Sequence, residues 1–145
     1  ASTQWRRLPR RREVASLALR GVTTAAYSAY PKQAISPTRR LRDGDPLPGG
    51  WVAVHTPGHT PGHTAYWHSA TRVLIAGDAL GSPLRGRVRG AGALYSEDNA
   101  AVRHSIRKLA DLAPEVICFG HGNELYNAAA VLRRLADRTA LKLPE

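Results

Sequence analysis

The sequence predicts an α/β fold in which helices cover a sheet, and two sets of apolar patterns support this prediction. Four short apolar runs bounded by turn residues indicate strands, at 51–54, 64–68, 72–76 and 116–119. Apolar residues at helical spacing predict two helices, at about 98–113 and 127–140. The resulting order, three strands, a helix, a strand and a helix, is typical of layered α/β proteins.

The first third of the chain differs from the rest in charge. Residues 1–42 form a basic, Arg-rich segment with ten basic residues and one acid, whereas residues 43–145 carry eleven basic and ten acidic residues. A helix is expected at about 10–20. Such an arm can bind nucleic acid, but no aromatic series is interleaved with the arginines, which favours a solvated surface. We treat 1–145 as a single, partial domain and 43–145 as its motif-bearing region.

The connections between the strands have distinct compositions. Residues 56–63, after the first strand, are punctuated by proline and glycine. The next two strands are close enough to form a β-hairpin. The strands around Ile75 and Ile117 are expected near the centre of the sheet, buried on both faces. Residues 81–96 combine glycine and arginine without apolar periodicity, which predicts a loop.

The helix at 98–113 has clear signals at both ends. Ser96 or Asp98 can cap its first turn, and Pro114 follows its last residues. No apolar run approaches the roughly 20 residues of a membrane span. The one cysteine, Cys118, excludes an internal disulfide framework and is expected in the core. We therefore expect a reducing, cytoplasmic location and no membrane partner.

Three residues with metal-binding side chains occupy the same kind of place. His59 lies in the loop after a strand, Asp78 directly follows a strand, and His121 ends another strand between two glycines. Ligand sites in α/β folds form at strand ends. Imidazole and carboxylate together suit zinc, iron or manganese. The three residues therefore form a candidate metal site.

Three sequence stretches in this order resemble the metallo-β-lactamase fold superfamily, and most closely its glyoxalase-II-like branch. They are VHTPGHTPGH at 54–63, LIAGDAL at 74–80 and FGHG at 119–122. The resemblance covers about residues 41–125. It implies an αββα sandwich and a metal-dependent hydrolase of an ester, thioester or lactone-like substrate, acting through a metal-bound hydroxide. It also implies zinc, one or two ions, with iron or manganese as alternatives.

The same resemblance implies a role for each residue of the candidate site. His59 is expected to bind the first metal, Asp78 to bridge both as the catalytic carboxylate, and His121 to bind the second. His63 and His55 are candidates for supporting or substitute ligands, although an ordinary structural role is favoured for both. The predicted loop is expected to shape substrate choice through its arginines, Arg85, Arg87 and Arg89.

One part of the family pattern has no counterpart here. The upstream HxHxDH motif is not found, and residues 1–50 contain no convincing series of strands. We therefore expect the chain to correspond to the C-terminal half of the fold, and to bind metal weakly and hydrolyse little by itself. Two alternatives stay open: an inactive, truncated pseudoenzyme, and a basic nucleic-acid-binding fragment. A homodimer is one way to cover the apolar side of the first helix.

Overall fold

A computed structural model describes residues 36–84, 87–91 and 96–140, with only the backbone at 82–84 and 87. The chain divides into two compact units, Ala1–Thr38 and Arg39–Glu145, and the elements below belong to the second. The helix expected at about 10–20 lies outside the described residues.

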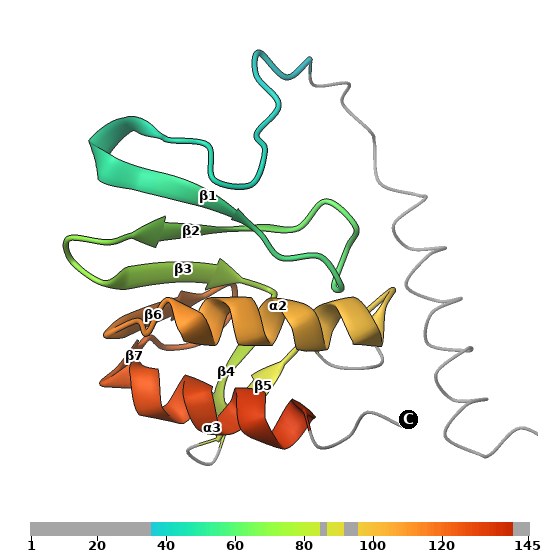
Figure 1. Cartoon of the computed structure of the whole chain (residues 1–145), viewed down its shortest axis with the longest axis vertical. Helices are drawn as coiled ribbons and strands as arrows, with labels where there is room; N and C mark the ends of the chain where they lie inside the picture. The colour runs from blue at the N-terminus through green and yellow to red at the C-terminus, as the bar shows by residue number, and fades with distance from the viewer. Residues whose placement is uncertain (1–35, 85–86, 92–95, 141–145) are drawn as a thin grey trace, which may run out of the picture. The chain divides into compact units, whose positions relative to one another are not determined.

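A five-stranded sheet forms the centre of this unit (Figure 1), with strand order β1-β2-β3-β6-β7. Its strands are β1 (Trp51–His55), β2 (Thr64–His68), β3 (Val73–Gly77), β6 (Val116–Phe119) and β7 (Leu125–Tyr126). The pairs β1–β2, β2–β3 and β6–β7 are antiparallel, whereas β3 and β6 are parallel. The four predicted strands are thus confirmed, and the two around Ile75 and Ile117 are neighbours as expected. The strand β7 was not predicted.

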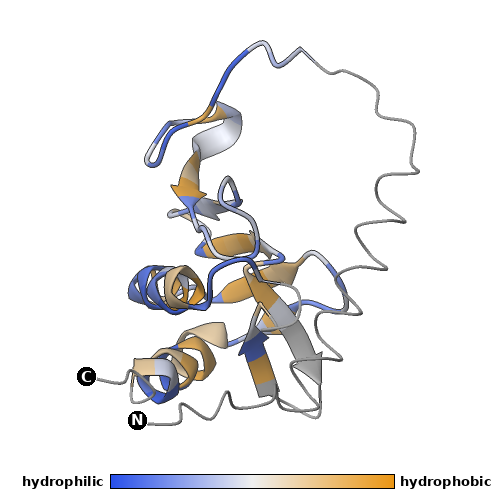
Figure 2. Cartoon of the chain, turned by 90° about the vertical axis from the view of Figure 1, so that its right-hand side faces the viewer, coloured by the Kyte–Doolittle hydropathy of each residue, from blue (hydrophilic) through white to orange (hydrophobic). Residues whose placement is uncertain are grey.

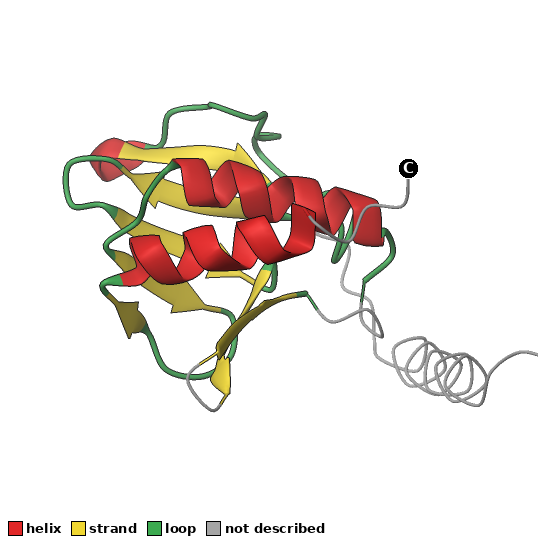
Figure 3. Cartoon of the chain, turned by 60° about the horizontal axis from the view of Figure 1, so that its bottom comes forward, coloured by secondary structure: helices red, strands yellow, loops and turns green. Residues whose placement is uncertain are grey.

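Two helices, α2 (Asn99–Asp111) and α3 (Ala128–Ala140), cover one face of the sheet (Figure 3). The Asp98 carboxylate caps α2 by accepting hydrogen bonds from the amides of Ala100 and Ala101, as the sequence predicted. Apolar residues line the strands and the sheet-facing sides of the helices (Figure 2). The largest buried apolar side chains of this core are Leu74, Leu80, Ile106, Leu109, Ile117 and Leu132. A short 3-10 helix, Pro48–Gly50, precedes β1. None of the helices in the described ranges is long and apolar enough to span a bilayer.

The expectation that the central strands are buried on both faces is wrong. Successive strand residues point to opposite faces, so Leu74 and Ala76 face the helices and are fully buried. Ile75, between them, is 38% exposed, and Tyr126 is 61% exposed. Cys118, which pairs with Ile75, is only half-buried rather than a core residue. The apolar strands therefore belong to a sheet of which the described residues cover only one face.

The loop predicted over 81–96 is partly a β-hairpin. Strands β4 (Leu80–Leu84) and β5 (Arg87–Gly90) form a separate two-stranded antiparallel sheet. Leu80 and Val88 are buried in the core, whereas Arg89 is exposed. The alternation of arginine with Val88 is a strand signal with a period of two residues, which the surrounding glycines obscured.

The parallel pair β3–β6 contains one irregularity next to the candidate site. Ile75 pairs with Cys118 and Gly77 with Phe119, so that β3 advances two residues while β6 advances one. This is the geometry of a β-bulge. Gly77 adopts a left-handed conformation (φ 53°) at the end of β3, which glycine reaches without steric cost.

Candidate metal centre

The topology explains why three distant sequence positions meet. β1 and β3 are both antiparallel to β2, and β6 is parallel to β3, so β1, β3 and β6 run in one direction. Their carboxyl ends therefore lie at the same edge of the sheet. His59 follows β1, Asp78 follows β3 and His121 follows β6. The three residues reach this edge from elements that are up to 62 positions apart in the sequence.

The Asp78 carboxylate lies between the two imidazoles. Its Oδ2 is 3.7 Å from Nε2 of His59, and its Oδ1 is 3.7 Å from Nε2 of His121. The convergence predicted from the sequence is thus present in the structure. Exposure differs among the side chains: His59 is 29% exposed, Asp78 41% and His121 92%.

A glycine after β6 leaves room for this carboxylate. A Cβ atom at Gly120 would lie 2.3 Å from Oδ1 of Asp78, which is closer than non-bonded atoms can approach. The amide of Gly120 also donates a hydrogen bond to the carbonyl of Gly77, at 2.9 Å. The residue before His121 therefore joins the ends of β3 and β6 and gives the Asp78 carboxylate its space.

The donor set fits part of a binuclear metal site. Two ligand atoms on one zinc ion lie at most about 4.2 Å apart, because each bond to nitrogen or oxygen is about 2.0–2.1 Å long. Both 3.7 Å separations fall within this limit and are too long for hydrogen bonds. Each carboxylate oxygen can thus share one ion with one imidazole.

The same donor set is incomplete for either ion. Protein zinc sites normally use three or four protein ligands, and these residues offer two to each ion. Within the described ranges, no group of three or more His, Cys, Asp and Glu side chains is arranged to hold one metal ion. These residues would therefore supply about half of the protein ligands for each of two adjacent ions.

His63 lies directly behind Asp78 and uses both of its ring nitrogens there. The backbone amide of Asp78 donates to Nε2 at 3.2 Å, so this nitrogen carries no proton. Nδ1 then carries the proton and donates to the hydroxyl of Thr56 at 2.8 Å. Burial, and next the nearby His59, lower the pKa of His63, which favours the neutral ring. A supporting role fits these contacts, and a ligand role would break one of them.

Two other histidines brace turns of the backbone. Nε2 of His55 donates to the carbonyl of Pro61 at 2.9 Å and so spans the loop that carries His59. His68 is half-buried: it bonds to the carbonyl of Gly49 and to Thr71, and packs edge-on against Trp51. His104 is exposed on α2.

The three arginines of the predicted substrate loop are described unequally. Arg85 and the side chain of Arg87 lie outside the described residues. Arg89 is exposed and pairs with Gly81 across the β4–β5 hairpin. Their role in substrate choice stays a prediction.

Helix α2 also contacts the loop that carries His59, which was not predicted from the sequence. Ser105 is buried and donates through Oγ to the carbonyl of Pro57, two residues before His59. Lys108 donates to the carbonyl of His55. One signal was available in the sequence: Ser105 is a polar residue beside the apolar stripe of Val102, Ile106 and Leu109, where an internal partner is expected.

The fold and the three strand-end residues define the class of protein. A sequence profile described as the metallo-beta-lactamase superfamily matches residues 3–121. The chain belongs to the metallo-beta-lactamase superfamily. It is 30% identical over 135 residues to the probable metallo-hydrolase YflN of Bacillus subtilis (strain 168), an alignment that covers 81% of this chain and 51% of that protein. The chain therefore spans about half the length of this curated relative.

Solved structures of similar proteins support the same family. The metallo-beta-lactamase family protein TTHA1429 from Thermus thermophilus is 26% identical, with a TM-score of 0.54 over 90% of this chain and 48% of its own. TTHA1623, crystallised in a di-iron-bound form, is 26% identical, with a TM-score of 0.57 over 81% and 57%. ST1585 from Sulfolobus tokodaii, at 18% identity and a TM-score of 0.61 over 88% and 51%, shows the fold alone.

Proposed function

We propose that this chain carries part of the active site of a metal-dependent hydrolase of the glyoxalase-II-like branch, which cleaves a small ester, thioester or lactone-like substrate. The observation that carries the proposal is the position of Asp78, whose two carboxylate oxygens each face a different imidazole at 3.7 Å. Membership of the superfamily and the similarity to a probable metallo-hydrolase support it.

The proposed cofactor is a pair of metal ions, either zinc or iron, with manganese as a further alternative. Imidazole and carboxylate donors suit all three metals. A similar protein was crystallised in a di-iron-bound form, which supports iron as an alternative to zinc. When bound, such ions lower the pKa of a water molecule and polarise a carbonyl group.

Four residues of this chain have proposed roles in the site. His59 would bind one ion and His121 the other. The two oxygens of Asp78, which lie between the imidazoles, would set the distance between these two positions. His63 accepts the hydrogen bond of the Asp78 amide and so holds this part of the backbone. The remaining ligands are proposed to come from a segment outside residues 1–145 that carries HxHxDH. Among the described residues Ile75 stays 38% exposed on the sheet face away from the helices, and we propose that this segment packs there.

The decisive variant is Asp78→Ala, in the longest natural polypeptide that contains this chain. We expect metal content and hydrolysis of an ester, thioester and lactone panel to fall by more than about 100-fold, beyond the roughly 10–100-fold typical of residues that only support ligands. Metal content by mass spectrometry and steady-state kinetics measure this.

The matched control is Asp111→Ala, which removes a carboxylate that pairs with Arg133 at 3.0 Å instead. The control should keep its metal and its activity. An Asp78→Ala protein that retains both would exclude the metallohydrolase mechanism.

The alternative functions stay predictions. Nucleic-acid binding depends on residues 1–42, most of which lie outside the described ranges, and a steep salt dependence of RNA or DNA binding would support it. A pseudoenzyme would show neither metal nor hydrolysis in the longest natural polypeptide. The cytoplasmic location and the homodimer also stay predictions.

A further inference from the structure

The loop that carries His59 would be costly to order if it were unsupported. It spans residues 56–63 between β1 and β2 and contains two prolines and two glycines. A metal ligand on a loose loop loses conformational freedom on binding, and this loss subtracts from affinity. The contacts of this loop therefore bear directly on how well His59 can bind an ion.

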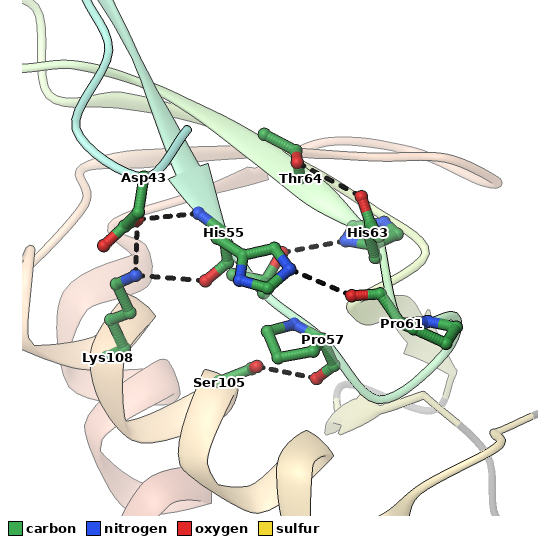
Figure 4. Close-up of polar contacts among 10 residues, drawn as sticks. Asp43, His55, Pro57, Pro61, His63, Thr64, Ser105 and Lys108 are labelled. Carbon is green, nitrogen blue, oxygen red and sulfur yellow. Dashed lines mark hydrogen bonds and ion pairs between the residues drawn. The ribbon is translucent and has the colours of Figure 1, made fainter. Parts of the chain in front are cut away.

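Helix α2 supplies hydrogen-bond donors to the chain leading up to His59 (Figure 4). Nζ of Lys108 donates to the carbonyl of His55 at 3.0 Å, and Oγ of Ser105 donates to the carbonyl of Pro57 at 2.8 Å. The amides of Glu97 and Asp98, just before the helix, donate to the carbonyl of Gly58 at 2.8 and 3.1 Å. Because Ser105 and Lys108 are three residues apart, they lie on one side of the helix.

The loop also lies in direct contact with the helix. A Cβ atom at Gly58 would lie 2.5 Å from Cγ2 of Val102 and 2.6 Å from its backbone nitrogen. Gly58 has a φ of 133°, a conformation open to glycine. The backbone thus approaches α2 more closely than any other residue type would allow at this position.

An ion pair completes the support at the start of the loop. Oδ1 of Asp43 accepts from Nζ of Lys108 at 2.6 Å and from the backbone amide of His55 at 2.8 Å. The amide and the carbonyl of His55 are therefore both held by the Asp43–Lys108 pair (Figure 4). At the other end, the ring of His55 reaches the carbonyl of Pro61.

We propose that Ser105 and Lys108 are positioning residues for the metal centre: they hold the His59 loop on α2 in its binding conformation before any ion arrives. The inference rests on the proposed function, because it assigns His59 as the ligand being positioned. It adds that affinity on this side of the site depends on a helix that contributes no ligand.

Hydrogen exchange of the metal-free protein tests the hold itself. The variants Ser105→Ala and Lys108→Met each remove one donor, and Arg107→Met removes an exposed cation from the same helix as the control. We expect faster exchange of the Gly58, His59 and Thr60 amides in the two test variants, with exchange in β6 unchanged. Unchanged loop exchange in both would overturn the proposal. Lys108→Arg, which keeps a donor, should restore slow exchange in the loop.

Zinc affinity, measured by competition with a chromophoric chelator, tests the link to His59. We expect about tenfold weaker binding for each test variant, at the low end of the range for groups behind a ligand, and unchanged binding for Arg107→Met. Faster loop exchange with unchanged zinc affinity would overturn the positioning role. If the unaltered protein binds none of zinc, iron and manganese, the proposed function fails, and with it the role at His59, whereas the exchange data still report on the support of the loop by α2.

Discussion

His59 and His121 face the same carboxylate at the same distance, but the structure prepares them differently. His59 is 29% exposed and sits in a loop whose carbonyls are held by α2. His121 is 92% exposed and sits in a Gly-His-Gly turn after β6. An exposed side chain must give up rotamer freedom when it binds an ion, whereas a supported one has already done so. The two imidazoles lie at equal distances from Asp78, but they differ in the conformational entropy that each would lose on binding an ion. The His59 side of the site is the preorganised one.

The largest effect should separate the two imidazoles. We expect His59→Ala to reduce zinc affinity by more than about 100-fold. The loss of zinc affinity for His121→Ala should be about tenfold smaller. A tenfold difference is about 1.4 kcal/mol, which matches the entropy lost when one exposed side chain is ordered. Titration with zinc, monitored by calorimetry, measures both.

The control for this pair is His104→Ala, which removes an exposed imidazole from α2. It should bind zinc like the unaltered protein. Equal losses at His59 and His121 would show that support by α2 does not set affinity.

A smaller effect is expected from Gly120→Ala, which removes none of the candidate metal ligands. Its new methyl group would lie 2.3 Å from Oδ1 of Asp78, so the carboxylate has to move away from His121. We expect a loss of zinc affinity of about 10–100-fold, as for other groups that orient a ligand. Gly62→Ala is the matched control, because a Cβ atom there meets nothing within 4 Å. A Gly120→Ala protein with unchanged affinity would show that the position of Asp78 is not critical.

His63→Ala should have a milder effect again, because it removes a support of the Asp78 backbone and no ligand. We expect about a tenfold loss of zinc affinity, far less than for Asp78→Ala. The Asp78 amide, followed by NMR, should shift because its acceptor at 3.2 Å is gone. A loss as large as that of Asp78→Ala would identify His63 as a ligand.

The smallest effect concerns acid, which should loosen the His59 side first. Lys108 and then the His55 amide hold the pKa of Asp43 below its ordinary value, and the amides of Ala101 and Ala100 do the same for Asp98. The folded state therefore binds fewer protons than the unfolded state. The stabilisation is complete above about pH 5 and is lost as the pH falls through the lower folded values.

Thermal melting between pH 6 and pH 3 measures this effect. Asp43→Asn should lower the melting temperature at pH 6 and show a smaller further drop at pH 3 than the unaltered protein. Both carboxylates are largely exposed to solvent, so the shift should be modest. An identical drop in both proteins would show that Asp43 contributes nothing to the acid sensitivity.

The candidate ligands were predictable because the signals are local. Each of His59, Asp78 and His121 sits beside small residues just after an apolar run, and strand direction carries all three to one edge. The cap at Asp98 and the two helices were predictable for the same reason. A strand, a cap and a helix are encoded in residues that are neighbours in the sequence.

The supports behind the ligands were not predictable, since they join residues far apart in the chain. Lys108 reaches Asp43 across 65 positions, and Ser105 reaches Pro57 across 48. Burial of the sheet was misjudged for a related reason. The apolar residues of β3 indicate that both faces of the strand are suited to burial, but they do not show which segment covers each face. No described residue covers Ile75 fully.

The bulge at the end of β3 makes this site sensitive to the number of residues in the strand. Leu74 and Ala76 point toward the helices, and strict alternation would send the side chain at position 78 the same way. The extra residue in β3 ends that alternation, and the carboxylate of Asp78 lies between the two imidazoles instead. A single-codon deletion in β3 would remove the extra residue, so that either the bulge or the alternation that buries Leu74 and Ala76 would be lost. Such a deletion can leave every candidate ligand encoded and still alter the strand that brings Asp78 to the site.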